Sequence, residues 1–513
     1  MAKSRILTAG ATLFFTLICW SLSSPINSHQ DEKFHLASIW CADGFDEHCA
    51  YQGLSETGVK TVLLKTNLCT PANTEETDYK RLLVARADGK CKFEFTVNEP
   101  LEKMDNMPNF FYETSTQIAA WIQPGHTQSF YYKALNLFDT SDAEQSVIRF
   151  RLVNSLLFVL LLIAFLLVSE QSIKSSALLG LFATMIPHGM FLISGVLNSS
   201  WSYAGCSLSW AFLYVLLNQP PILNWKTGLA TLGWIVSSGI VLFSRYDALI
   251  ILVLTNLTIL ALNIYTGTKH PKIFLSALFI VSSIITRVSW LSFPRIEALI
   301  QAPDTQSHGL KDLLINFGTA IKLLAATSFR ILGSAPPGWG PLKASQIIFT
   351  TNLLFFAVVT TAAFRSINKA ELGVFLLNLI MLLGIFLVQL SVRPNWSTPF
   401  YLIRTSWTSD SFFPRYFIPY FPFLFGMLIL GSKNFVEILT NIKFKSSLLT
   451  VLTFTQAVTL HNIGKPFREN PSWYWQNFPI GVQPVFVIGT ISFAVFLYLL
   501  LVPSTNEKRI NAL

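Results

Sequence analysis

The segment 29–35, His-Gln-Asp-Glu-Lys-Phe-His, places two adjacent carboxylates and a histidine directly after an apolar run. Asp31, Glu32 and His35 are residue types that accept and donate protons, so this spacing can supply a general base for an acceptor hydroxyl. A second interpretation is a helix N-terminus with favourable acidic residues, because the apolar stretch 34–40 follows. Position alone favours the second interpretation.

Three arginines at the ends of apolar runs, Arg151, Arg245 and Arg415, are candidates to bind a lipid phosphate. A guanidinium binds phosphate oxygens in a bidentate manner and keeps its charge when it is partly buried. The alternative is an arginine that reaches lipid headgroups or pairs with a neighbour, as Arg245 could with Asp247. For any single arginine this alternative is favoured. That at least one of Arg245 and Arg415 binds a lipid phosphate is favoured as much as that neither does.

Four of the six cysteines, Cys41, Cys49, Cys69 and Cys91, lie in one polar stretch. An even number of cysteines in such a loop predicts two disulfides and an oxidising, non-cytoplasmic compartment. A zinc site is the alternative, but no Cys-x-x-Cys spacing supports it. The pairing of the four cysteines stays open.

The elements that must position these residues are apolar runs of membrane-spanning length. Of the 513 residues, 52% are hydrophobic and 13% are charged, whereas soluble domains carry roughly 25% charged residues. Apolar runs of about 20 residues predict transmembrane helices. They occur at residues 6–22, 152–168, 177–197, 201–217, 229–243, 248–265, 273–291, 347–364, 372–392, 416–431, 448–463 and 482–502. The sequence therefore predicts an all-α integral membrane protein with about 12 transmembrane helices (roughly 11–13).

These runs divide the chain into five parts. The parts are a first transmembrane helix (1–24), a large extracytoplasmic loop (25–147), transmembrane helices 2–7 (148–292), an outer loop (293–345) and transmembrane helices 8–12 (346–513). A cleaved signal peptide is the alternative for the first part, since Ser21 and Ser23 are small residues suited to a cleavage site. Within the outer loop, residues 310–332 alternate apolar and charged faces at helical spacing. This pattern predicts an interfacial amphipathic helix, with a thirteenth span as the alternative.

The lysines indicate the orientation of the chain. With a cytoplasmic N-terminus, every short loop assigned to the inside carries at least one lysine, and Lys508 and Arg509 follow in the tail. This positive-inside pattern places the cysteine loop outside and both termini in the cytoplasm. The net charge of +9 is spread over the ends of the runs without a basic stretch. Membrane lipids are therefore expected partners, and nucleic acid is not.

The Asp31-Glu32 pair at the start of the first outer loop resembles the DE motif of the GT-C glycosyltransferases, polytopic enzymes that use polyprenyl-phosphate sugars. The chain is also similar to a bacterial family of uncharacterised multi-pass membrane proteins considered GT-C-like. Three further segments carry the resemblance: 149–154 (Arg-Phe-Arg-Leu-Val-Asn), 198–201 (Asn-Ser-Ser-Trp) and 415–419 (Arg-Tyr-Phe-Ile-Pro).

The resemblance implies a GT-C-like fold with a retained first helix in a bacterial cytoplasmic membrane. It implies a glycosyltransferase that moves a sugar from a polyprenyl-phosphate-linked donor to an envelope glycan, lipid or protein on the outer face. Asp31 would be the base, with Glu32 or His35 orienting it or helping to hold a metal. No cofactor is certain, a divalent metal ion is one option, and no second catalytic carboxylate is assigned.

Two other functions stay open: a transporter or flippase of lipid-linked saccharides, and a non-catalytic envelope-assembly membrane protein. The near absence of ionisable residues inside the apolar runs argues against an ion-coupled transporter.

Overall fold

The computed structural model describes the helical body and short parts of the large loop. The described residues are 3–24, 32, 35, 36, 39, 42, 49–54, 60–64, 83–87, 90–94, 110–114, 129–140, 143–218, 224–267, 270, 271, 273–275, 277, 278, 280–282, 317, 318, 321, 346–365, 367, 369–392, 418–432, 441–469 and 481–502.

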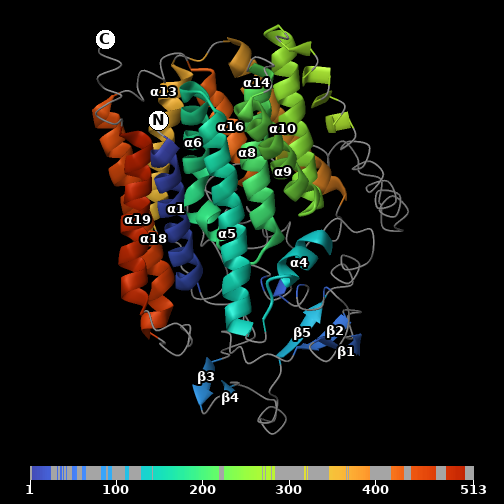
Figure 1. Ribbon diagram of the computed structural model, residues 1–513, viewed down its shortest axis with the longest axis vertical. Coiled ribbons are helices and arrows are strands. Elements are labelled where there is room, and N and C mark those ends of the chain that lie inside the picture. Colours follow the sequence, from blue (N-terminus) through green and yellow to red (C-terminus); the bar gives the residue numbers. More distant parts are fainter. Residues whose placement is uncertain are drawn as a thin grey trace.

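Long helices, with shorter ones between them, run side by side and form the body of the molecule (Figure 1). They are α1 (Lys3–Ser23), α5 (Ala143–Val168), α6 (Gln171–Thr184), α7 (Met190–Ile193), α8 (Asn198–Asn218), α9 (Trp225–Leu242), α10 (Tyr246–Tyr265), α13 (Gln346–Phe364), α14 (Lys369–Val392), α16 (Phe421–Leu430), α18 (Ile442–Glu469) and α19 (Val482–Leu501). A π-helical turn, η2 (Met185–Gly189), joins α6 to α7, and a 3-10 turn, η6 (Ile418–Tyr420), precedes α16.

Six described helices are long and apolar enough to cross a membrane. They are Lys3–Ser23, Gln145–Val168, Gln171–Ile193, Ala248–Tyr265, Gln346–Phe364 and Val482–Leu501. Three shorter apolar helices accompany them: Ile273–Ser282, Leu372–Gly384 and Ile418–Leu430. The all-α integral membrane prediction is thus confirmed for the body, while the total of about twelve spans stays a prediction. The predicted interfacial helix at 310–332 lies outside the described residues, apart from Phe317, Gly318 and Ile321.

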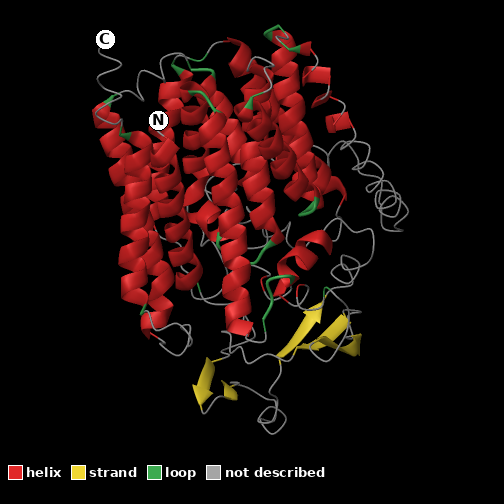
Figure 2. Cartoon of the chain, in the orientation of Figure 1, coloured by secondary structure: helices red, strands yellow, loops and turns green. Residues whose placement is uncertain are grey.

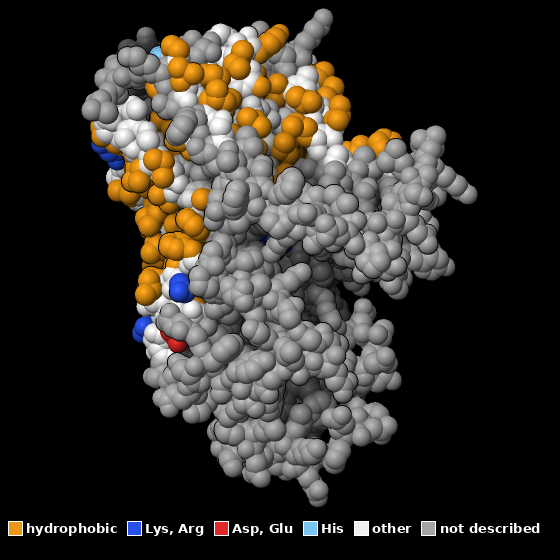
Figure 3. Space-filling view, turned by 90° about the vertical axis from the view of Figure 1, so that its right-hand side faces the viewer, with side chains coloured by type: hydrophobic (Ala, Val, Ile, Leu, Met, Phe, Trp, Pro, Cys, Tyr) orange, Lys and Arg blue, Asp and Glu red, His pale blue; other side chains and the backbone are white. Residues whose placement is uncertain are grey.

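On the face that Figure 3 shows, hydrophobic side chains make up much of the described surface of the helical body. Leu160 of α5, Ile235 of α9, Ile380 of α14 and Ile491 of α19 are all exposed. Exposed apolar surface on this scale is costly in water, and it is the surface expected of helices that face lipid acyl chains.

The helices approach closely where one of them carries a glycine. A Cβ on Gly180 of α6 would collide with the backbone of α16 at Pro422 and Gly426, and a Cβ on Gly426 would collide with the Trp210 ring. Small residues of this kind allow neighbouring membrane helices to pack through their backbones. The span Gln171–Ile193 is accordingly almost completely enclosed by other helices.

This enclosed span is interrupted near its middle. Ile186 has extended backbone angles (φ −118°, ψ 125°) between α6 and α7. Pro187 explains the interruption, because proline lacks an N–H donor and disfavours helical angles at the preceding residue. Asn352 of α13 donates to the Ile186 carbonyl at 3.0 Å. The carbonyl that the interruption releases from the helix is thereby satisfied inside the protein, as the membrane interior requires.

The two ends of the body differ. At one end, the termini-side end, Arg5 of α1 donates to the carbonyls of Leu499, Tyr498 and Val502 at the end of α19. The first and last described helices therefore begin and end beside each other. At the opposite, loop-side end, α1 ends, α5 begins, and a short helix α4 (Ser129–Asn136) follows the strands of the large loop (Figure 1).

The large loop contains short antiparallel strands at the loop-side end (Figure 2). Strands β1 (Cys49–Leu54), β2 (Lys60–Leu64) and β5 (Phe110–Thr114) form one sheet in the order β1-β2-β5. Strands β3 (Leu83–Ala87) and β4 (Lys90–Glu94) form a separate pair. All described strands thus lie within the predicted extracytoplasmic loop, which adds a small β portion to the helical membrane body.

Candidate functional site

A buried ion pair lies where α1 ends and α5 enters the body. Arg151 of α5 donates through Nη2 to Oε2 and Oε1 of Glu32 at 2.9 and 3.0 Å, and through Nε to Oε1 at 3.1 Å. Both side chains are completely buried. The contact is bidentate, which is the strongest arrangement between a guanidinium and a carboxylate.

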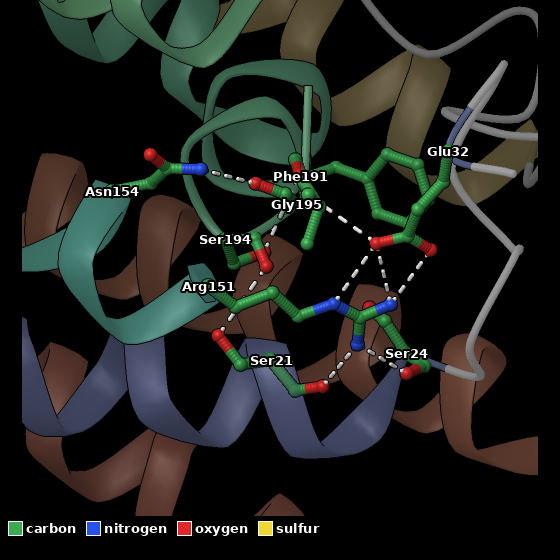
Figure 4. Close-up of polar contacts among 9 residues, drawn as sticks. Ser21, Ser24, Glu32, Arg151, Asn154, Phe191, Ser194 and Gly195 are labelled. Atoms are coloured by element: carbon green, nitrogen blue, oxygen red, sulfur yellow. Dashed lines mark hydrogen bonds and ion pairs between the residues drawn. The ribbon is translucent and has the colours of Figure 1, made fainter. Parts of the chain in front are cut away.

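Arg151 also contacts the end of α1. Its Nη1 donates to the carbonyls of Ser21 and Ser24, each at 2.7 Å. The last carbonyls of a helix lack partners within the helix, and a cation beside them is favoured by the helix dipole. Figure 4 shows the guanidinium between the α1 backbone and the Glu32 carboxylate. Arg151 therefore joins α5 to α1 and to the segment that follows α1.

The turn between α7 and α8 is bound to the same group. The backbone N–H of Val196 donates to Oε1 of Glu32 at 3.2 Å, and Ser21 Oγ donates to the Ser194 carbonyl at 3.3 Å. Asn154, one turn after Arg151 in α5, donates to the Gly195 carbonyl at 2.8 Å (Figure 4). Three consecutive residues of this turn are thus each held by a side chain from another segment.

Asn154 extends the network towards α8 and α4. Its Oδ1 accepts from Nε1 of Trp201 at 2.9 Å, and its Nδ2 donates to the Tyr131 hydroxyl at 3.4 Å. The Tyr131 and Trp201 rings meet edge to face with centroids 5.0 Å apart. Burial raises the pKa of Tyr131 above its ordinary value, so the phenol stays protonated. Two of the segments that carry the GT-C resemblance, 149–154 and 198–201, therefore meet in one hydrogen bond.

His35 is buried against α4. Its Nδ1 lies 3.0 Å from the Tyr132 hydroxyl, and the two rings stack with centroids 5.9 Å apart. The Tyr131 ring meets the same imidazole edge to face at 6.5 Å. His35 and Glu32 therefore both fix the start of the large loop to the helical body.

Arg245 lies at the same end of the body, at the N-terminus of α10. Its Nη1 donates to Ser199 Oγ in the first turn of α8 at 3.1 Å, and the side chain is partly buried. Ser244, just before it, shares a hydrogen bond of 2.9 Å with Ser202. These contacts hold the Arg245 guanidinium and the preceding residue against α8.

The other predicted site residues are only partly within the described chain. Asp31, Arg415, Cys41 and Cys69 lie outside it. Cys49 and Cys91 lie on strands of different sheets, β1 and β4, and their side chains are outside the described part. The predicted disulfides therefore stay a prediction. Among the described residues no group of three His, Cys, Asp or Glu side chains could hold a metal ion.

Two of the predicted site residues, Glu32 and Arg151, bind each other inside the protein. All the guanidinium nitrogens of Arg151 donate inside the protein, and the expected contact of this arginine with a lipid phosphate stays a prediction. Glu32 pairs with Arg151 and accepts the backbone N–H of Val196, and its role in orienting Asp31 stays a prediction. The sequence analysis does not name Asn154 or Trp201 as site residues. Both nevertheless lie in segments 149–154 and 198–201, which carry the GT-C resemblance.

The apolar helical body and its polar network define a polytopic, integral helical membrane protein. The model of the family described as "Predicted membrane protein (DUF2142)" matches residues 14–424, most of the chain, so the protein belongs to this family. The predicted membership of a multi-pass membrane protein family is thus confirmed, whereas the family match shows no link to GT-C enzymes. No curated protein and no solved structure matches the chain.

Proposed function

We propose that the protein is a membrane glycosyltransferase that moves a sugar from a polyprenyl-phosphate donor to an envelope glycan, lipid or protein. In this proposal the loop-side end faces outwards and both termini are cytoplasmic. The six candidate spans are completed by α8, α9, α14, α16, α18 and the apolar run 273–291 to a set of about twelve. The membrane is that of a bacterial cell. Asp31 is the base and the acceptor is an alcohol.

The observation that carries the proposal is the buried Glu32–Arg151 pair. Glu32 is fixed to α1, α5 and the α7–α8 turn, and in the proposal this fixed point positions the adjacent residue, Asp31, as the base. A general base needs such a fixed position, because proton transfer is efficient only within hydrogen-bond reach. Burying two charges carries a desolvation cost. In the proposal this cost is retained because the pair fixes the position of the segment that carries Asp31.

The reaction is a displacement at the anomeric carbon. Asp31 takes the proton from the acceptor hydroxyl, whose oxygen forms the new bond to the anomeric carbon as the bond to the lipid phosphate breaks. The configuration inverts. The leaving phosphate needs charge stabilisation more than a proton, and Arg245 and Arg415 supply it. Arg245 suits this role because it is held at the loop-side end by Ser199 and remains partly exposed.

One observation favours the second function, a transporter of lipid-linked saccharides. The enclosed span Gln171–Ile193 is interrupted at η2, and interrupted helices near the bilayer midplane are a feature of transporter sites. A transporter moves the intact lipid-linked sugar and releases no polyprenyl phosphate, so product analysis separates the two functions.

The test compares cells that carry the parent chain, Asp31→Asn or Glu170→Gln. Glu170 is an exposed carboxylate between the end of α5 and the start of α6, and it serves as the matched control. Loss of a general base lowers the rate by about 10²–10⁴-fold, so sugar transfer to the envelope should be lost in Asp31→Asn and kept in Glu170→Gln. Normal glycans in cells that stably express the Asp31→Asn variant would refute the transferase function.

The proposed orientation and the disulfides have a separate test. A membrane-impermeant thiol reagent applied to intact cells should label the loop cysteines only after reduction, because the disulfides block their thiols. Cys19 and Cys206 are buried in the body, so they should add little background labelling. Labelling of all four loop cysteines without reduction would exclude the disulfides. No labelling even after reduction would place the loop on the cytoplasmic side.

A further inference from the structure

Helix α4 has two apolar faces, and only one of them packs on the helical body. Tyr131, Tyr132 and Leu135 are completely buried on the inner face. Their hydrogen bonds and ring contacts with Asn154, His35 and Trp201 fix the helix to the end of the body. The direction in which the outer face of α4 points is therefore set by the same network that holds Glu32.

The outer face is unusually apolar for a surface outside the spans. Phe130 is 50% exposed, Leu137 is 84% exposed and Phe138 is 43% exposed. Phe130, Lys133 and Leu137 are spaced three and four residues apart, so they lie along one side of the helix and its following turn. A water-facing surface would expose these side chains at a cost of about 25 cal/mol for each Å² of apolar area.

This face continues onto the end of a long helix of the body. The Phe130 ring contacts Phe243, the residue that caps the C-terminus of α9, with centroids 4.7 Å apart. Phe243 is itself 36% exposed. On the outside of α9, Leu232 and Ile235 are exposed as well. The outer face of α4 is therefore connected to the apolar outer surface of α9 at the level where α9 ends.

Two cations flank this apolar surface. Lys133 is exposed between Phe130 and Leu137, and Arg245 follows Phe243 by two residues. Apolar side chains with interspersed basic ones are the pattern of helices that lie in the headgroup region, where the basic groups meet lipid phosphates. The charge and the apolar side chains thus fit the same occupant, an anionic lipid surface.

We propose that α4 is a membrane-surface helix: Phe130, Leu137 and Phe138 enter the headgroup layer on the loop side, and Lys133 binds anionic lipid phosphates. The inner face of α4 holds the start of the large loop through His35 and Tyr132. Contact with the bilayer therefore sets the height of that segment above the membrane. This proposal does not depend on transferase activity.

The test measures the depth of single labelled positions in the full-length protein in vesicles. Cysteine replaces Leu137, with Leu160→Cys as the lipid-facing reference and Glu170→Cys as the water-facing reference. Each variant carries a nitrobenzoxadiazole label, and the parent chain treated in the same way gives the background of native cysteines. The quenchers are a nitroxide on the upper acyl chain of the lipid and a water-soluble nitroxide.

The label at Leu137 should be quenched by the nitroxide lipid, as at Leu160, and hardly by the aqueous nitroxide. Quenching mainly from water, as at Glu170, would overturn the proposal. Protection from both quenchers would also overturn it, because the face would then be covered by protein. Leu137 is largely exposed, so the substitution leaves the fold intact; Phe138→Cys is a second position with the same expected result.

The anionic preference has its own variant. In vesicles with nitroxide-labelled phosphatidylglycerol, quenching at Leu137 should exceed that with labelled phosphatidylcholine. Lys133→Gln should reduce this preference about fivefold, the factor expected for one basic side chain at an anionic surface. An unchanged preference would exclude Lys133 as the phosphate-binding group.

Discussion

The polar contacts at the loop-side end and those inside the helical body are built differently. At the loop-side end a charged pair, Glu32–Arg151, joins α1, α5, the α7–α8 turn and the start of the loop. Among the described residues inside the body, the contacts between helices are made by neutral side chains, as in Trp234–Asn256 at 3.0 Å and Thr184–Tyr203 at 2.9 Å.

This difference shows where a charged side chain can be buried in the described part of the protein. A buried guanidinium is stable only when carboxylate and carbonyl oxygens surround it, and the end of α1 supplies those carbonyls. In the body the backbone carbonyls already accept hydrogen bonds within the helices. A buried charge there would lack acceptors, so neutral side chains make the contacts. The loop-side network should therefore be far more sensitive to substitution than the neutral pairs.

The largest effect is expected for Arg151→Met. Removing the guanidinium leaves a buried carboxylate without its cation and two helix-end carbonyls without a donor, at a cost of about 3–5 kcal/mol. Equilibrium unfolding in mixed micelles, followed by circular dichroism, measures the loss. The matched control is Arg149→Met, because Arg149 is exposed in the same helix. Equal losses in the two variants would show that the pair has no special role.

A smaller effect is expected for Asn154→Leu. This substitution leaves the Trp201 N–H and the Gly195 carbonyl without partners, and a buried unsatisfied group costs about 1–3 kcal/mol. The same unfolding measurement applies, with Asn218→Leu as control, since Asn218 bonds only within its own helix to the Tyr214 carbonyl. A loss no greater than that of Asn218→Leu would remove Asn154 from the network.

The smallest effect is expected for the neutral pair Trp234–Asn256. A double-mutant cycle with Trp234→Phe and Asn256→Leu should give a coupling of about 0.6 kcal/mol, the average for hydrogen bonds between membrane helices. A coupling as large as that of the charged pair would erase the distinction between the two regions.

The sequence predicts the membrane body well because apolar runs of sufficient length have few alternatives in water. The runs 6–22, 152–168 and 482–502 all reappear as candidate spans. The interruption after Thr184 is also visible in advance, since Pro187 lies within an apolar run. The large loop is different: its composition is that of an ordinary globular segment, and its strand pairs do not follow from apolar runs.

The site was predicted only in its parts. The sequence points to both Glu32 and Arg151, but in separate roles, because a pair 119 residues apart in the chain leaves no periodic signal. Arg151 directly precedes the apolar run 152–168, where an arginine can also reach lipid headgroups, so the sequence alone does not reveal its buried partner. α4 was missed because eight residues are too few for a run of spanning length.

The most direct test of the central claim, that Glu32 and Arg151 act as one anchor for the start of the loop, is a double-mutant cycle with Glu32→Leu and Arg151→Met. Each single variant leaves one buried charge unpaired and should lose about 3–5 kcal/mol, while the double variant removes both charges and should lose much less than their sum. Additive losses, within about 0.5 kcal/mol, would contradict the account.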